Sequence, residues 1–549
     1  MANDQQAFFV DDELVERLLR GDAPIAGKAT RPANSSAVTE AIQHATAGRL
    51  DEAARTLESA ASRGEDLVDV YSALGQVRFE QQRWQDAATA YGQVAAQDPK
   101  HLTARYNLGL VLERQGKFAI AATEFEAAAK NNPKLWQAHA ARGLCLLQTN
   151  HLEDALHSFD EALRTQPSSD RVLFGKAVAL HRLGRWDEAA DLYRKLLPGN
   201  ATSEDLLTNL IAISAVRKDE TKARDYAERL VRVSPQNRVA LETLASHALS
   251  KGEYPTAAQQ YSQVVKLAPN SYECWFNLGV AQQKAGRLDQ AGLAYNEAGR
   301  IRPEAPEAFA NLGAALQQRG EVMDAVRAYE KALANFAEMP GVLWNLAIIA
   351  EQTHQPGDAE KYLERLVKVA PEFEDAAFRL GFLQLQRGDF AGAVDSFELC
   401  VKRRPDWVDA LLNLGLACWK FEDLETAHAT FEHVLTLQPG QQDAQRALLT
   451  IALERKEHAT AWSLYQQLAA ARQLTSELAF NVGLLLQQAG QNEESAECYN
   501  TSHTLAPDFA PALLNLGHAL KAMGKDEEAR QTWGRAIAAD PALATGYFK

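Results

Sequence analysis

The sequence predicts an all-α fold in which pairs of helices repeat along the chain and stack as a solenoid. Prolines recur at residue numbers 99, 133, 167, 235, 269, 303, 371, 405, 439, 507 and 541, so every interval is 34 or 68 residues. Apolar residues between them follow the three-to-four-residue spacing of helices, and no stretch alternates like a strand. A period of this length is typical of repeat architectures, in which each repeat packs on its neighbours.

Several other positions keep the same phase as the prolines. With Pro99 at position 32, about fifteen repeats cover residues 34–543 and begin at residues 34, 68, 102, 136, 170, 204, 238, 272, 306, 340, 374, 408, 442, 476 and 510. Position 20 is alanine in fourteen repeats, with Ser495 as the exception. Position 8 is glycine in nine repeats and alanine in four, and position 24 is aromatic in twelve. This agreement fixes the frame of the repeat.

Each of these positions has a structural role. Apolar residues at positions 4, 7 and 11 predict a first helix, and those at positions 20, 24 and 27 predict a second. Small residues at positions 8 and 20 let the two backbones approach, and the ring at position 24 fills the space beside them. Position 15 is glycine in nine repeats, where the first helix needs a left-handed terminating residue. We expect the proline at position 32 to end the second helix.

This pattern resembles the tetratricopeptide repeat, and the stretch from Tyr106-Asn107-Leu108-Gly109 to Pro133 matches it closely. The resemblance covers nearly the whole chain. It implies antiparallel helix pairs stacked into a right-handed α-solenoid superhelix. It also implies that the first helix of each pair lines a concave groove.

The sequence also has a second period that is longer than the 34-residue repeat. Position 32 lacks proline at Glu65, Ala201, Ala337 and Gln473, which are 136 residues apart. We interpret this spacing as duplication of a block of four repeats. The proline-free junctions are predicted to change the pitch of the superhelix locally.

Composition and motifs argue against several classes of function. The chain has 57 basic and 72 acidic residues, a net charge of −15, which disfavours nonspecific binding to nucleic acid or to an anionic membrane. We find no nucleophile elbow, phosphate-binding loop or zinc-protease motif, so we expect no enzyme activity, cofactor or metal. The five cysteines show no C-x-x-C spacing, and no segment predicts a secretory signal or membrane span, so we expect a cytoplasmic protein.

Position 6, on the concave side of the first helix, is asparagine in eight repeats. These residues are Asn107, Asn209, Asn277, Asn311, Asn345, Asn413, Asn481 and Asn515. An amide carries both a donor and an acceptor, so a ladder of amides can pair with the backbone of an extended peptide. The ladder resembles the groove of the O-GlcNAc transferase superhelix. The alternative is that each asparagine only bonds a neighbouring helix.

Bulky residues at positions 5 and 9 accompany the ladder. They are Phe276, Trp344, Phe378, Phe382 and Phe480, and they make residues 272–416 the candidate binding segment. Exposed aromatic side chains would anchor a partner, whereas half-buried ones would only fill space between first helices. Position 2 is acidic in eight repeats, which favours a basic or polar partner, although an acid there also stabilises the helix dipole.

The two ends of the chain carry separate predictions. Residues 1–20 contain a short amphipathic helix that either caps the first repeat or docks elsewhere, and residues 21–33 form a flexible linker. Residues 544–549 are a C-terminal tail. Because the last second helix has little cover, we expect self-association through Trp533, Tyr547 and Phe548.

These observations predict a non-catalytic scaffold or adaptor that binds a partner protein or extended peptide in the concave groove. Two alternatives stay open. The chain could be a structural protein that assembles through its solenoid ends, or an accessory subunit that recruits substrates to a separate enzyme.

Overall fold

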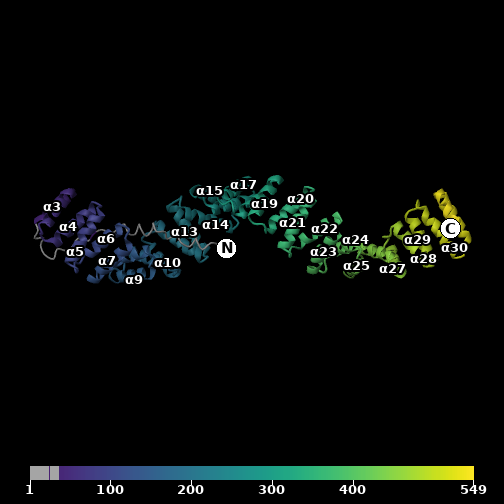
Figure 1. The fold of residues 1–549 in the computed structure, drawn as a ribbon, viewed down its shortest axis with the longest axis horizontal. Coiled ribbons are helices and arrows are strands. Elements are labelled where there is room, and N and C mark those ends of the chain that lie inside the picture. The colour runs from purple at the N-terminus through teal and green to yellow at the C-terminus, as the bar shows by residue number, and fades with distance from the viewer. Residues whose placement is uncertain (1–23, 25–35, 549) are drawn as a thin grey trace. The chain divides into compact units, whose positions relative to one another are not determined.

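The computed structural model describes residue 24 and residues 36–548, which form thirty α-helices and one 3-10 helix (Figure 1). The helix predicted in residues 1–20 lies outside the described residues, and so does the predicted linker apart from Pro24. The chain divides into an N-terminal body that ends at Arg302 and a C-terminal body that begins at Pro303. No strand forms in the described residues.

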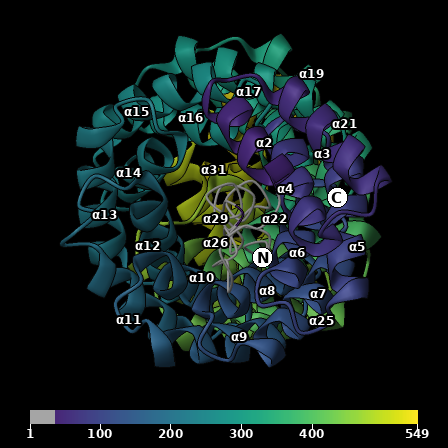
Figure 2. The ribbon, with the colours of Figure 1, turned by 90° about the vertical axis from the view of Figure 1, so that its left-hand side faces the viewer.

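The N-terminal body holds sixteen helices, two in each of its eight repeats. They are α2 (Ser36–Thr46), α3 (Leu50–Ser62), α4 (Leu67–Glu80), α5 (Trp84–Gln97), α6 (Ala104–Arg114), α7 (Phe118–Asn131), α8 (Trp136–Gln148), α9 (Leu152–Thr165), α10 (Asp170–Arg182), α11 (Trp186–Leu196), α12 (Glu204–Val216), α13 (Glu220–Val233), α14 (Arg238–Ser250), α15 (Tyr254–Leu267), α16 (Tyr272–Lys284) and α17 (Leu288–Ile301). In Figure 2 the first helices α10, α12, α14 and α16 lie on the inside of this curved stack, and the second helices α9, α11, α13 and α15 lie outside.

The C-terminal body continues the same pattern with fourteen helices. They are α18 (Pro306–Gln318), α19 (Val322–Asn335), α20 (Pro340–Gln352), α21 (Pro356–Val369), α22 (Glu374–Arg387), α23 (Phe390–Arg403), α24 (Val408–Lys420), α25 (Leu424–Leu437), α26 (Gln442–Glu454), α27 (His458–Ala470), α28 (Ser476–Gln488), α29 (Asn492–Leu505), α30 (Ala510–Ala522) and α31 (Asp526–Ala539). A 3-10 helix, η2 (Pro541–Phe548), follows them. The predicted α-solenoid of fifteen helix pairs is confirmed.

Glycine at position 8 and the ring at position 24 interlock in the nine repeats that have this glycine. A Cβ atom added to Gly109 would lie 2.7 Å from the ring of Phe125, and one added to Gly313 would lie 2.6 Å from the ring of Tyr329. All nine position-8 glycines face the ring of their own repeat in this way. In the repeat that begins at residue 204 the sizes are reversed, because Ile211 and Ala227 occupy the two positions and both are buried. The predicted close approach of the two helices is therefore confirmed.

Position 15 adopts a left-handed backbone in every repeat, whether or not glycine occupies it. The nine glycines have φ between +74° and +87°. The other six residues have φ between +56° and +66° and are Gln82, Asn150, Lys218, His354, Glu422 and Lys456. A side chain with a Cβ costs roughly 1 kcal/mol in this conformation. Packing of the two helices therefore imposes this turn even on residues that disfavour it.

Proline at position 32 is not required to end the second helix. Helix α7 ends at Asn131, two residues before Pro133, but α19 ends at Asn335, two residues before Ala337. Phe336 leaves the helix with φ −144° and ψ 105°, so an extended residue stops α19 without proline. The expectation that proline ends the second helix is therefore corrected. The helix also ends where position 32 is not proline, because the residue after the helix is already extended.

The C-terminal end is covered within its own body. Trp533 is only 4 % exposed, and its indole nitrogen donates to the carbonyl oxygen of Leu514 at 3.1 Å. Helix η2 packs against α30 and α31. The side chains of Tyr547 and Phe548 lie outside the described residues. Because the ring of Trp533 on α31 is buried against α30, it is not available to a second chain.

Candidate peptide-binding groove

Two ladder asparagines are oriented by a buried tyrosine of the preceding repeat. The side-chain nitrogen of Asn277 on α16 donates to the hydroxyl of Tyr261 on α15 at 3.3 Å, and that of Asn345 on α20 donates to the hydroxyl of Tyr329 on α19 at 3.0 Å. Burial raises the pKa of both tyrosines to about 12, so each hydroxyl is protonated at neutral pH. These contacts are those expected if position 6 bonds a neighbouring helix.

The hydrogen bond of Asn345 fixes the orientation of its amide and uses only the side-chain nitrogen. The hydroxyl of Tyr329 donates to the side-chain oxygen of Gln317 at 2.8 Å, which completes a chain of two hydrogen bonds. The side-chain oxygen of Asn345 accepts no hydrogen bond from any of the described residues, and the side chain is half-buried. A fixed amide with an open acceptor is suited to bind a peptide N–H.

The other ladder residues differ in exposure. Asn107 and Asn209 are 5 % and 1 % exposed, so a peptide in the groove cannot reach them. Asn413 donates to the carbonyl oxygen of Asp409 in its own helix at 2.8 Å. The remaining members, Asn311, Asn481 and Asn515, are half-buried or exposed.

A pocket in the C-terminal body brings two ladder residues together. It has a volume of about 690 Å³ and lies between the first helices α18 and α20. Asn311 and Asn345 both line it, and so does Tyr329. The structure therefore places two predicted residues, one helix pair apart, on one cavity.

The rest of the pocket wall comes from the turn between the two repeats. Phe336 and Met339 supply apolar surface, and Phe336 is 51 % exposed. Glu307 at the start of α18 and Glu338 in the turn supply two carboxylates, and the wall contains no lysine or arginine. The pocket thus combines amides, an apolar surface and negative charge. Position 2 contributes Glu307, as the acidic pattern predicts.

The predicted aromatic anchors are mostly packed against other rings. Phe276 stacks on Tyr272 with ring centres 5.7 Å apart, and Trp344 meets Phe373 edge to face at 4.8 Å. Phe378 stacks on Trp407 at 4.7 Å.

Phe480 likewise meets Phe509 at 5.0 Å. Phe382, by contrast, is 44 % exposed. Of the five aromatic residues, Phe382 alone is exposed, and the other four are half-buried.

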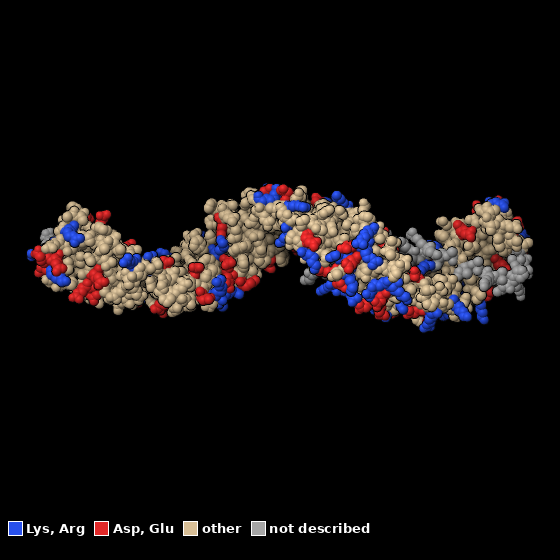
Figure 3. All heavy atoms as spheres, turned by 180° about the vertical axis from the view of Figure 1, so that it is seen from behind, with Lys and Arg blue, Asp and Glu red and all other residues tan. Residues whose placement is uncertain are grey.

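Charged residues on the surface are mixed. On the face that Figure 3 shows, lysine and arginine alternate with aspartate and glutamate and form no continuous basic stripe. Many form short ion pairs, such as Arg302 with Glu273 at 2.8 Å. In the C-terminal body, Arg379 pairs with Glu351 and also lies over the ring of Trp344.

Sequence reasoning missed Tyr329, Phe336 and Met339 as members of the site. Tyr329 was assigned to packing alone, whereas its hydroxyl also orients Asn345. The available signal for the other two was the proline-free junction at Ala337, since the turn that lines the pocket spans it.

Other kinds of site were also sought in the described part of the chain. No group of three or more histidine, cysteine, aspartate or glutamate residues there could hold a metal ion. None of the five cysteines forms a disulfide, and all five are buried. None of the described helices is long and apolar enough to cross a membrane.

The sequence matches two family models, both described as tetratricopeptide repeat. One matches residues 38–101, 72–119, 106–156, 141–204, 219–271, 242–306, 311–354, 345–406 and 378–441, and the other matches residues 510–543. The chain therefore belongs to the tetratricopeptide repeat family. A comparison with curated proteins found no match.

Several solved structures are similar. YrrB, described as a tetratricopeptide repeat protein with an unusual peptide-binding site, is 22 % identical, with a TM-score of 0.30, over 35 % of this chain and 98 % of its own. Naa15/Naa10 bound to HypK-THB is 14 % identical, with a TM-score of 0.34. The match covers 91 % of this chain and 81 % of the other. A tetratricopeptide repeat protein from Parabacteroides merdae is 17 % identical, with a TM-score of 0.27. The match covers 45 % of this chain and 98 % of the other.

Proposed function

We propose that this chain is a non-catalytic interaction scaffold that binds an extended segment of a partner protein across α18 and α20. The observation that carries the proposal is the pocket lined by both Asn311 and Asn345. The amide of Asn345 is held by Tyr329 and keeps its oxygen open toward an incoming donor. An amide fixed before binding loses little side-chain entropy when a peptide N–H reaches it.

The wall of the pocket favours a particular partner chemistry. Glu307 and Glu338 would attract a lysine or arginine side chain, and the exposed ring of Phe336 would cover the aliphatic stem of that side chain. Backbone pairing with amides does not depend on the partner's sequence, whereas the carboxylates select for charge. We therefore propose an extended segment that carries at least one basic residue.

An affinity pull-down from the native lysate, read by mass spectrometry, tests the proposal. The full-length chain is immobilised as wild type and as Asn311→Ala/Asn345→Ala. Each lost hydrogen bond weakens binding by about 1 kcal/mol, so the double variant should retain partners roughly tenfold to thirtyfold less well. A second variant, Glu307→Gln/Glu338→Gln, should lose the same partners.

Matched controls separate binding from stability. Asn277→Ala removes the same kind of bond to a tyrosine, but Asn277 does not line the pocket. Asn413→Ala removes a ladder residue that bonds its own helix. If both controls keep the partners that the double variant loses, the pocket is the binding site. If the double variant keeps the wild-type set of partners, the proposal is wrong.

A further inference from the structure

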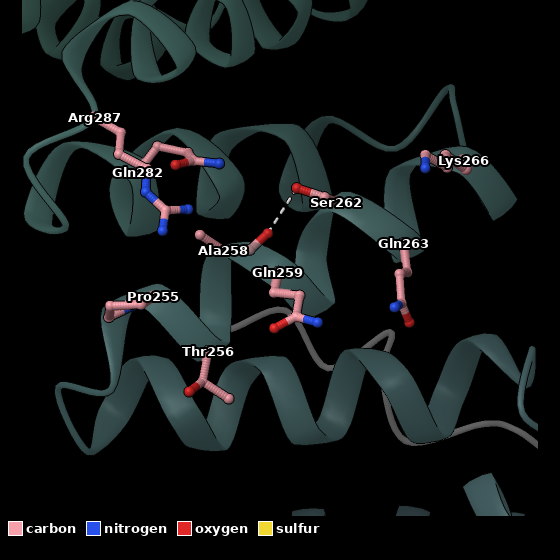
Figure 4. A pocket seen from close by; sticks show the side chains of 9 residues that line it. All are labelled: Pro255, Thr256, Ala258, Gln259, Ser262, Gln263, Lys266, Gln282 and Arg287. Atoms are coloured by element: carbon pink, nitrogen blue, oxygen red, sulfur yellow. Dashed lines mark hydrogen bonds between the residues drawn. The ribbon is translucent and has the colours of Figure 1, made fainter.

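A second pocket, in the N-terminal body, has the opposite charge. It has a volume of about 500 Å³ and lies along the outer helix α15, beside the end of α16 and the start of α17 (Figure 4). Lys266 and Arg287 line it, and no aspartate or glutamate does. The charge of this wall is therefore opposite to the net charge of the chain, which is −15.

The two cations of this pocket are not paired within the protein. Within the part of the chain that the structure describes, neither Lys266 nor Arg287 forms an ion pair, and both side chains are exposed. Arg287 is also the residue that precedes α17, and no side chain caps that helix. Because Asp289 in the first turn of α17 offsets the partial positive charge of that helix start, the positive field of the pocket comes from the side chains of Lys266 and Arg287.

A buried oxygen points to a ligand that carries a donor as well as a charge. Gln282 on α16 is 7 % exposed and lines the pocket, yet its side-chain oxygen has no hydrogen-bond partner. An unmet buried acceptor costs about 1–3 kcal/mol, which an incoming N–H would recover. In Figure 4, Gln282 lies beside Arg287, on the opposite side of Ala258 from Gln263 and Lys266.

The remaining polar groups of the wall are neutral. Gln259, Gln263 and Thr256 are exposed and can donate to an anion, whereas the hydroxyl of Ser262 already donates to the carbonyl oxygen of Ala258 at 2.7 Å. The wall therefore offers two cations, several neutral donors and one buried acceptor. An acidic side chain and the backbone N–H next to it match this arrangement.

We propose that this pocket binds an anionic side chain of a partner peptide together with an adjacent backbone N–H. Glutamate and phosphoserine supply the same chemistry, because in each the central atom of the anionic group is four bonds from the backbone nitrogen of that residue. The site lies in a different body from the groove between α18 and α20, so this proposal does not depend on peptide binding in that groove. It would give the scaffold a second contact with opposite charge preference.

Fluorescence polarisation with three labelled peptides tests this proposal on the full chain. The peptides share the sequence Gly-Ala-X-X-Ala-Gly, where X is glutamate, phosphoserine or glutamine. We expect at least one acidic peptide to bind the wild type about tenfold more tightly than the glutamine peptide. The variant Lys266→Gln/Arg287→Gln should remove that preference, and Lys284→Gln, which changes a cation of α16 outside the wall, should keep it.

A third variant tests the role of the buried oxygen. Gln282→Leu should weaken the preferred peptide about fivefold without lowering stability, since it removes an unpartnered polar group. Preference for glutamate alone or phosphoserine alone identifies the source of the anion. The proposal is overturned if neither acidic peptide binds better than the glutamine peptide, or if the double variant binds them as tightly as the wild type.

Discussion

Replacing Gly313 by alanine tests whether the interlock of glycine and ring holds the groove in shape. The new Cβ atom would lie 2.6 Å from two ring carbons of Tyr329, so the ring must move by about 0.8 Å to reach ordinary contact at 3.4 Å. Tyr329 is fully buried, and its hydroxyl bonds both Gln317 and Asn345. Overpacking of this kind costs about 1–3 kcal/mol, and a lost hydrogen bond adds about 1 kcal/mol.

Two effects reduce the expected cost. Alanine favours a helix over glycine by about 0.5–1 kcal/mol. Alanine at position 8 also coexists with a buried tyrosine in another repeat, at Ala245 and Tyr261, so the ring can be accommodated. We therefore expect Gly313→Ala to destabilise its region by about 2 kcal/mol rather than to unfold the chain.

Amide hydrogen exchange is the appropriate assay, because a solenoid can open locally without unfolding as a whole. Amides of α18, α19 and α20 should exchange about thirtyfold faster in Gly313→Ala. The control is Gly534→Ala in α31, where no atom lies within 4 Å of the added Cβ, so that helix should become more stable. Equal protection in the two variants would refute the interlock as a source of stability.

Three further predictions concern single positions. Lys218→Gly should raise the free energy of unfolding by about 1 kcal/mol in urea titrations. Lys218 has a left-handed backbone with φ +56°, which glycine adopts without the steric cost of a Cβ atom. An unchanged midpoint would contradict this. Ser271→Ala should lower stability by about 1 kcal/mol, because its hydroxyl accepts from the backbone N–H of Cys274 and caps α16. Burial raises the pKa of Cys400 and Cys498 to about 12, above the unfolded value near 9, so both contribute stability that is lost as pH rises from about 9 to 12. Thiol-reactive dye should label these cysteines only after unfolding, and fast labelling of the native chain at pH 8 would be inconsistent with that burial.

The periodic part of the fold was predictable because each conserved feature of the repeat has one local cause. In the repeats with glycine at position 8, an added Cβ atom would lie too close to the ring at position 24, as Gly313 with Tyr329 shows. The left-handed turn at position 15 was predictable where glycine occupies it. At Glu422 the same turn forms against the residue's own preference, and no local signal in the sequence marks it.

The candidate site was predictable only in part, because exposure depends on neighbours that differ between repeats. Asn209 and Asn481 occupy the same position, yet Asn209 is 1 % exposed and Asn481 is exposed. The pocket itself depends on the path of the turn through Phe336 and Met339, which the spacing of prolines does not specify. The sequence therefore identifies the ladder, whereas the packing of particular repeats decides which of its members are open.

The reversed pair Ile211 and Ala227 limits how this chain can be rearranged. Most repeats place a small residue on the first helix and a ring on the second, so their helices are close to interchangeable. Pairing α13 with a first helix that has glycine at position 8 would leave a void beside Ala227. Recombination within this repeat is thus penalised, and its two helices must be inherited or grafted together.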